Sequence, residues 1–424
     1  MLKNTIISEF FTTVNFTIFL QTIGFLTYKL PFIRYGNNVA ELENELLSYI
    51  GNPNSKIISF YNARSAIYHA LKIIDLKNTD EVIVSGYNCV SVSNVVIQSG
   101  AKIIYSDIDE TNLGLCIDSL EKNITLNTKA IIVQHTFGKP ANIKEIVALA
   151  RNKNILIIED CAHSLGSSID GVKLGSFGDF SVFSTGRDKV ISGVTGGFLI
   201  INNNRYIDKL EQVKSIQIMP SIILTFQNLL YNISAYKSYK LYDFFGLGKM
   251  IIYLSRKFKF ITEILTVNEK KCSFTDFNYK LPNSLAYLAK KQLHKINDIN
   301  NHRIALSDYY DKNINNKYFK PLFTIIKSEN NNYFRYPIIL ESEEVKEELY
   351  IYMKKNNILL GNTWSKTNIV PYGTNLDDAK YIAGSCPVSE DISKRILNLP
   401  NHTLITIEDA DKIIQLLNNF KNNV

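Results

Sequence analysis

Two short segments near the middle of the chain carry polar residues whose types can do chemistry together. Asp160 ends the segment Ile157-Ile158-Glu159-Asp160, and Lys189 comes five residues after Ser184. A carboxylate can pair with a cationic ring nitrogen, and a lysine can form a Schiff base with an aldehyde. Taken alone, Asp160 is better explained as a cap of the next segment, and Lys189 as a solvated loop residue.

Glycine-rich turns flank both residues and favour the chemical interpretation. The turns are GSFG at 175–178 and GG at 196–197. Small residues and backbone amides near the start of a helix can hold a phosphate group. A carboxylate, a lysine and a phosphate-binding turn are the set of groups that pyridoxal phosphate requires. The sequence therefore predicts a site for this cofactor.

Alternating strand-like and helix-like segments surround these residues. Short β-rich runs occur at 57–60, 82–84, 103–105, 131–133, 155–158 and 198–201. Apolar residues recur at helical spacing from Val39 to Ile50, where Gly51 can end the helix, and again over 143–150. This alternation predicts an α/β fold with a mostly parallel sheet covered by helices, in which ligands lie beyond the carboxyl ends of the strands.

The run GSFGDFSVFSTGRDK, which ends at Lys189, resembles the cofactor-lysine segment of the DegT/StrS-type sugar aminotransferases. That family is a branch of the aspartate-aminotransferase-like fold, or fold type I of pyridoxal-phosphate enzymes. Further segments resemble the family in the same order: NARSA at 62–66, DEVIV at 80–84, DID at 107–109, QHTFG at 134–138, EDCAHSLG at 159–166, NYK at 278–280 and LP at 399–400. The resemblance extends from about residue 36 to the C-terminus.

The resemblance implies catalytic roles for three residues. Lys189 forms the Schiff base with the cofactor and then moves a proton between the cofactor carbon and the substrate carbon. Asp160 pairs with the pyridine nitrogen, and His163 lies beside the ring and its hydroxyl. Asp188 is an unusual neighbour of the lysine, and we expect it to raise the pKa of Lys189 if the two are close.

The resemblance also implies which residues bind the cofactor phosphate. Ser184 and the turn at Ala63 and Arg64 are expected to hold it. Asn278 is expected to reach the phosphate of a neighbouring subunit, so the active unit should be a homodimer.

One position departs from the family pattern. Cys89 stands where the family usually places an aromatic residue over the cofactor ring. Tyr87, two residues away, and His163 are the alternatives for stacking on the ring. We expect His135, Cys161 and Trp364 to be structural, and Arg187 to be either a phosphate ligand or a solvated loop residue.

The domain organisation follows from the same patterns. We expect an apolar N-terminal extension at 1–35, a large cofactor-binding domain at 36–270 and a smaller α+β domain at 271–424, which ends in a helix running to about Phe420. The large domain includes a basic, aromatic insertion at about 206–265. Between Glu211 and Glu263 the only acidic residue is Asp243, against seven lysines and arginines. The insertion can be a helical flap or can lie on an anionic membrane.

The N-terminal extension is uncharged from Phe10 to Tyr28. It is long enough to span a membrane, but Asn15, Gln21 and several threonines favour an amphipathic or buried segment. No small-residue cleavage site of a signal peptide follows it.

Composition excludes several function classes. The net charge is +7 without a compact basic stripe, so nucleic acid is not an expected partner. The five cysteines form no CxxC pair and predict neither a metal site nor disulfides. We expect a cytoplasmic protein, with peripheral contact to the inner face of the membrane as an open alternative.

The predicted function is transfer of an amino group, with glutamate as the expected donor, to a keto sugar. The sugar is expected to be linked to a nucleotide and to serve the synthesis of surface polysaccharide or a related glycan. One alternative is a pyridoxal-phosphate-dependent sugar dehydratase, but that branch of the family replaces the Schiff-base lysine. The other is a non-catalytic, membrane-associated protein that retains the fold.

Overall fold

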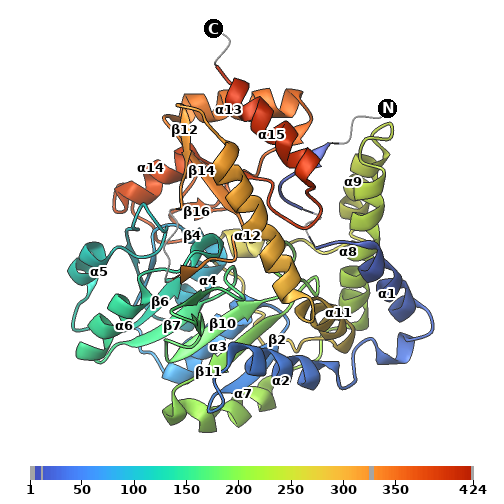
Figure 1. Cartoon of the computed structure of the whole chain (residues 1–424). Coiled ribbons are helices and arrows are strands. Elements are labelled where there is room, and N and C mark those ends of the chain that lie inside the picture. The colour runs from blue at the N-terminus through green and yellow to red at the C-terminus, as the bar shows by residue number, and fades with distance from the viewer. Residues whose placement is uncertain (1–4, 11–12, 324–328, 422–424) are drawn as a thin grey trace.

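The computed structural model describes residues 5–10, 13–323 and 329–421 (Figure 1). Its centre is a seven-stranded sheet with the order β2-β11-β10-β7-β6-β3-β5. The strands are β2 (Lys56–Phe60), β3 (Glu81–Ser85), β5 (Lys102–Ser106), β6 (Thr128–Gln134), β7 (Leu156–Asp160), β10 (Phe180–Ser184) and β11 (Gly197–Ile201). Only β11 runs against its neighbours, and the other strands of this sheet are parallel. The predicted sheet is therefore confirmed.

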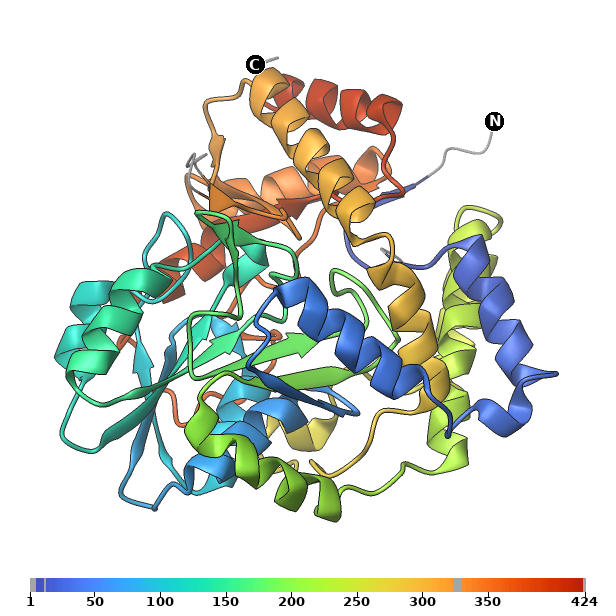
Figure 2. The same ribbon diagram turned by 60° about the horizontal axis from the view of Figure 1, so that its bottom comes forward.

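Side chains of each strand alternate between two hydrophobic cores. In β6, Ile131 and Val133 join the core beneath α2 (Asn38–Ile50), α6 (Ile143–Asn152) and α11 (Asn283–Leu293). Ala130 and Ile132 join the opposite core beneath α3 (Ala63–Ile74) and α4 (Val90–Ser99). Figure 2 shows α2 lying across one face of the sheet. Both faces are covered, which explains why the strands read as nearly continuous apolar runs.

The predicted helix at 39–50 is found as α2, and Gly51 ends it in the left-handed conformation with φ 84°. The helix at 143–150 is found as α6. All six predicted strands are present, whereas β10 was not among them. Its sequence, FSVFS, mixes polar and apolar residues, yet the sheet buries all five side chains.

A small antiparallel sheet with the order β12-β14-β17 lies beyond the large one. Its strands are β12 (Phe319–Pro321), β14 (Tyr336–Leu340) and β17 (Ile396–Leu399), and its helices are α12 (Ile296–Asn313), α13 (Glu343–Lys355), α14 (Pro387–Arg395) and α15 (Ile407–Asn419). This part occupies the top of Figure 1 in orange and red. The last helix confirms the predicted C-terminal helix. Because α11 packs on α2, the boundary near residue 270 stays a prediction.

The remaining elements are short. The helices are α5 (Ile117–Asn123), α7 (Leu210–Ile216) and α10 (Val267–Lys270), with 3₁₀ turns at Leu30–Phe32, Thr136–Gly138 and Asn204–Lys209. The strands are β4 (Asn88–Cys89), β8 (Ser168–Ile169), β9 (Val172–Lys173), β13 (Glu329–Asn330) and β16 (Ile369–Val370).

The N-terminal segment contacts two distant parts of the chain. Strand β1 (Ile6–Ile7) pairs in parallel with β15 (Ile358–Leu359). Helix α1 (Phe16–Leu26) packs on α8 (Ile222–Lys240), which in turn packs on α9 (Leu247–Lys257) (Figure 1). Most of the insertion is thus the helix pair α8 and α9, which follows the short α7, and the N-terminal helix packs on α8. Among the residues that the structure describes, no helix is both long and apolar enough to cross a bilayer.

Candidate active site

The carboxyl edge of the large sheet brings the predicted cofactor residues together. Asp160 at the end of β7 lies opposite Val182 of β10, two residues before Ser184. Ser184 lies opposite Gly197, and Gly197 lies opposite Phe60 at the end of β2. The register therefore places the carboxylate, the serine and the start of α3 along one edge of the sheet.

Asp160 is a buried carboxylate whose charge is only partly compensated. Its side chain is 6 % exposed, and its Oδ1 accepts a hydrogen bond of 3.0 Å from the Ala162 N–H. Burial raises the pKa of Asp160, and the Ala162 bond, Lys189 and His135 oppose that shift. Among the described residues, no ion pair within 4.0 Å involves this carboxylate. A cationic group bound beside Asp160 would stabilise its charged form.

Lys189 lies in the turn that follows β10. Burial lowers its pKa, and the influence of Arg335 acts in the same direction, whereas Cys89, Asp160 and Asp188 raise it. Asp188 does raise the pKa as expected, but it is the weakest of these influences and burial outweighs it. The lowered pKa suits a lysine that must lose a proton before it can attack a carbonyl carbon.

The start of α3 can hold a phosphate. Asn62 caps the helix, and its side chain accepts the Ser65 N–H at 2.9 Å. The N–H groups of Ala63 and Arg64 precede the capped one, and helix N-termini favour anions. A Cβ on Gly197 would lie 2.2 Å from the Asn62 carbonyl carbon, so only glycine permits this close approach of β11.

The side chain of Arg64 points to another partner. Its guanidinium pairs with the buried Glu269 and donates to the Ile264 carbonyl at 3.1 Å. Glu269 belongs to the capping box of α10, directly after the insertion. The side chain of Arg64 thus anchors the end of the insertion, and its backbone N–H remains the group to bind phosphate.

His163 is enclosed by aromatic rings. Its ring stacks on Phe334 with centroids 4.8 Å apart and meets the edge of Trp364 at 5.0 Å. Burial lowers its pKa well below 6.5, and Lys189 and Arg335 lower it further. The imidazole is therefore neutral. Because Nδ1 accepts the Phe137 N–H at 3.4 Å, the ring proton lies on Nε2, which can donate.

The alternatives at the ring-stacking position differ in their surroundings. Tyr87 is fully buried, its hydroxyl donates to the Trp364 carbonyl, and its ring meets Trp364 edge-on. Cys89 is partly buried at the start of α4, and it raises the pKa of Lys189. Trp364 is a packing residue, as expected. The structure thus directs the polar end of Tyr87 away from solvent into the small-sheet core.

Two predicted residues have partners outside the cofactor site. Asn278 is exposed, and its carbonyl accepts the Ile218 N–H at 2.9 Å. Arg187 is neither solvated nor free: it donates to the Thr262 carbonyl at 2.6 Å and lies over the Tyr231 ring at 3.8 Å. Arg187 therefore holds the insertion against the Lys189 turn.

Arg335 is a site residue that sequence reasoning missed. Its guanidinium lies 5.3 Å from the centre of the Phe334 ring, which stacks on His163, and it lines one cavity together with Asp188. It lowers the pKa of Lys189 and of His163. Arg335 lies in none of the family motifs. The one feature of the sequence that could have pointed to it is its position between Phe334 and Tyr336, at the start of the apolar run 336–340. The small sheet brings it to the edge of the large one.

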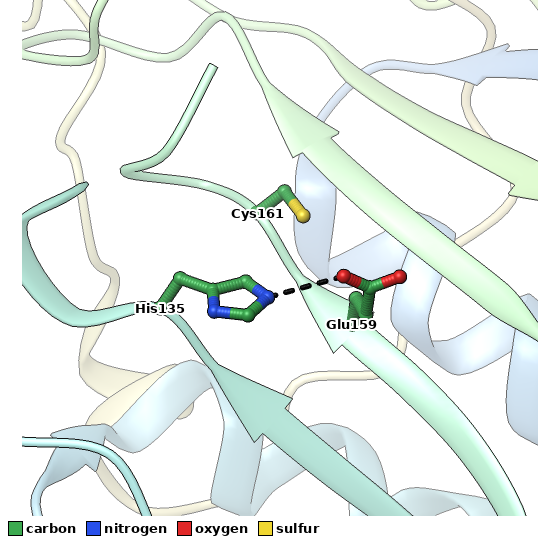
Figure 3. Close-up of side chains that lie close together, drawn as sticks. All are labelled: His135, Glu159 and Cys161. Atoms are coloured by element: carbon green, nitrogen blue, oxygen red, sulfur yellow. Dashed lines mark hydrogen bonds and ion pairs between the residues drawn. The ribbon is translucent and has the colours of Figure 1, made fainter. Parts of the chain in front are cut away.

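A neighbouring cluster of His135, Glu159 and Cys161 is structural (Figure 3). His135 Nδ1 accepts the Ala141 N–H at 3.1 Å, which leaves Nε2–H to donate to Glu159 at 3.2 Å. Glu159 also accepts the backbone N–H groups of the 175–178 turn at 2.7 to 2.9 Å. Both heteroatoms of the ring and both carboxylate oxygens are thus in use.

The residues present fit pyridoxal phosphate. A buried carboxylate with uncompensated charge suits a pyridinium nitrogen, Lys189 has a lowered pKa, and a capped helix start faces a glycine that no side chain could replace. A large, mostly parallel sheet with these groups at its carboxyl edge defines a pyridoxal-phosphate enzyme of fold type I.

The family model of the DegT/DnrJ/EryC1/StrS aminotransferases matches residues 28–244 and 252–418, and the chain belongs to this family. GDP-perosamine synthase of Escherichia coli O157:H7 is 25% identical over 385 residues, which cover 91% of this chain and 90% of that protein. A UDP-N-acetyl-3-dehydro-alpha-D-glucosamine 3-aminotransferase of Acidithiobacillus ferrooxidans is 30% identical over 45% of this chain and 51% of its own.

The fold is similar to that of solved sugar aminotransferases. The putative sugar aminotransferase Spr1654 of Streptococcus pneumoniae, in its PMP form, superposes with a TM-score of 0.74 at 21% identity, over 98% of this chain and 97% of its own. PseC of Helicobacter pylori gives 0.73 at 20% identity, over 96% and 98%. The protein is an aminotransferase with pyridoxal phosphate as its cofactor, and the dehydratase and non-catalytic alternatives are not favoured.

Proposed function

We propose that this protein transfers an amino group from glutamate to a keto sugar linked to a nucleotide, in the synthesis of a surface polysaccharide or related glycan. The observation that supports the proposal is the placement of Asp160 and Lys189 at one edge of the sheet, where burial raises the pKa of the carboxylate and lowers the pKa of the lysine. The names of the relatives support the acceptor: a GDP-linked sugar in one and a UDP-linked sugar in the other.

The residues of this chain have separate tasks in the reaction. Bound pyridoxal phosphate supplies an electron sink for the bonds of the substrate carbon. Asp160 keeps the ring nitrogen protonated. Lys189 Nζ, with its lowered pKa, takes the proton from the donor carbon and later delivers one to the sugar carbon. His163 Nε2–H donates a hydrogen bond beside the ring.

Absorbance of the purified holoenzyme tests the proposal. Adding glutamate should shift the visible cofactor band to the shorter wavelength of the aminated cofactor, and adding the keto sugar nucleotide should restore it. Lys189→Ala should show no such cycle, although it should unfold at a similar temperature. A protein whose spectrum does not respond to glutamate would contradict glutamate as the donor.

The proposal includes a homodimer in which Asn278 reaches the phosphate of the neighbouring site. The exposure of Asn278 supports it. Mixing inactive Lys189→Ala and Asn278→Ala chains tests it, because hybrid dimers contain one site that carries both native residues. Activity of the mixture should therefore exceed the sum of the two variants, and strict additivity would refute shared sites.

We also propose that the α8–α9 pair lies on an anionic membrane surface. Phe245, Tyr253 and Phe258 are at least half exposed there, among exposed basic residues. Sedimentation with phosphatidylglycerol vesicles should be lost when Lys249, Arg256, Lys257 and Lys259 become glutamate. The same change at the exposed residues Lys122, Lys129, Arg151 and Lys153, in or beside α5, β6 and α6, is the matched control and should leave binding intact. Helices α5 and α6 lie at the left of Figure 1, and α9 lies at the right. Equal loss in both variants would refute a specific surface.

A further inference from the structure

The N-terminal segment places a carboxylate beside the Lys189 turn. Glu9 is 5 % exposed, and it forms an ion pair with Arg335. Its carboxylate also accepts the Thr363 N–H at 3.1 Å and the Thr363 hydroxyl at 2.9 Å. Glu9 and Arg335 both influence the pKa of Asp188, the neighbour of the cofactor lysine. A residue from the start of the chain therefore reaches the edge of the active site.

Two arginines in this region have buried N–H groups without a hydrogen-bond partner. Arg303 is 1 % exposed, and its Nε and Nη1 make no hydrogen bond, while Nη2 reaches the Val190 carbonyl only at 3.5 Å. The Nε of Arg335 also lacks a partner. Burial and the nearby Arg335 lower the pKa of Arg303 to about 10, so it stays charged at neutral pH. Buried guanidinium donors of this kind call for an anion.

The Glu9 carboxylate pairs with Arg335, but the buried N–H groups of Arg303 remain without an anionic partner. Ser8, Glu9, Asp188, Arg303, Arg335 and His402 are among the residues that line one cavity. Burial lowers the pKa of His402 to about 4, so this histidine adds no charge at neutral pH. The remaining space is about 10 Å³, enough for one water molecule but not for a carboxylate. An anionic ligand can therefore enter only if Glu9 leaves.

The segment that carries Glu9 is buried and is held by side-chain bonds as well as by a short strand. Thr5 bonds to Asp243, and the Ser8 hydroxyl donates to the Asn398 carbonyl at 3.1 Å. Strand β1 has two residues, with backbone bonds from the Ile6 N–H to Asn357 and from the Ser8 N–H to Leu359, at 3.0 and 2.9 Å. His402 bonds to the Ile7 carbonyl at 2.8 Å. The pairing with β15 is only two residues long, so Glu9 can leave the cavity when this strand and the side-chain bonds around it open together.

We propose that the Arg303–Arg335 cavity binds a carboxylate group of the amino donor, and that Glu9 occupies it as an internal substitute that the donor must displace. The inference rests on the proposed function, since a dicarboxylic amino acid carries the same group as the Glu9 side chain. The N-terminal segment thus competes with the donor and makes its binding weaker than the two arginines alone would give.

Calorimetric titration of the holoenzyme with glutarate tests the competition, because glutarate has no amino group and cannot react. We expect Glu9→Gln to bind glutarate about tenfold more tightly than the native protein, and Arg335→Gln to bind it at least tenfold more weakly. Thr363→Val loses one hydrogen bond to Glu9 without a change of charge, and it should tighten binding about threefold. Glu121→Gln, on the exposed surface of α5, is the matched control and should bind as the native protein does.

Hydrogen exchange gives a readout that does not depend on activity. Saturating glutarate should speed exchange of the Ile6 and Ser8 amides, whereas glutaramide, which has no charge, should not. Unchanged exchange with glutarate, or equal glutarate affinity of Glu9→Gln and the native protein, would overturn the proposal. The absorbance response to glutamate tests the proposed function separately, so either idea can fail while the other stands.

Discussion

Two neighbouring carboxylates at the end of β7 have opposite surroundings. Glu159 accepts three backbone N–H groups and the His135 ring N–H, and it is fully buried. Asp160 is nearly as buried, yet it accepts one hydrogen bond, and its pKa is raised by burial. Successive residues of a strand point to opposite faces, so one strand end serves two purposes.

The comparison separates structural from chemical acids. A carboxylate that is fully satisfied by its own chain has nothing left to offer a ligand, whereas a buried carboxylate with unused acceptor capacity needs one. Both residues belong to one motif, EDCAHSLG, so the motif alone does not distinguish them. Changes on the two sides of β7 should therefore affect different properties of the protein.

The largest effect is expected from Asp160→Asn. The variant cannot hold a proton on the ring nitrogen of the cofactor, so turnover should fall roughly a thousandfold, about 4 kcal/mol of transition-state stabilisation. Steady-state kinetics measure this effect. The melting temperature of the variant should stay close to that of the native protein, and comparable activity in both would contradict the role of Asp160.

Glu159→Gln should instead reduce stability. An amide has only one acceptor oxygen for the three backbone N–H groups of the 175–178 turn, and its NH₂ group faces the others. We expect the free energy of unfolding to fall by about 3 kcal/mol, as measured by denaturant titration. Turnover per folded molecule should fall far less than in Asp160→Asn. A variant that is fully stable but inactive would reverse the assignment.

The pH dependence of stability provides a further test of the buried groups near Asp160, through the neighbouring His163. Native His163 stays neutral because its pKa lies well below 6.5, whereas in the unfolded chain the ring takes up a proton below that value. Because only the unfolded chain binds this proton, the free energy of unfolding is unaffected by His163 above pH 6.5 and decreases as the pH falls below that value. The loss should grow with each further drop in pH.

Chemical unfolding across this pH range measures the loss from His163. The difference between the native protein and His163→Gln isolates its contribution from those of His69 and His402, whose pKa values are also lowered by burial. Parallel pH profiles for the two proteins would show that His163 does not titrate in this way.

The smallest effect is expected when a metal ion is added to the protein, because the cluster of His135, Glu159 and Cys161 should not bind it. His135, Glu159 and Cys161 lie close enough to ligate one ion, but the donor atoms of His135 and Glu159 are already in hydrogen bonds. Burial and Glu159 raise the pKa of the Cys161 thiol well above 9. Cobalt(II) should therefore give no thiolate–cobalt absorption band. A band that Cys161→Ala abolishes would show that the cluster is an open metal site.

The sequence by itself determined the sheet and the chemistry at its edge. Apolar runs and helical spacing are local signals, so six strands and the helices at 38–50 and 143–152 followed from them. The family motifs are contiguous, which let Lys189, Asp160 and His163 be named. Strand β10 was missed because its alternating polar residues become buried only between two neighbouring strands.

The tertiary structure alone decided three further points. Burial outweighs Asp188 in setting the pKa of Lys189, and only packing determines burial. The side chain of Arg64 turns to Glu269, about two hundred residues along the chain, because the insertion folds back over α3. Glu9 meets Arg335 because β1 pairs with β15. Each contact joins residues far apart in sequence, and no local pattern encodes such proximity.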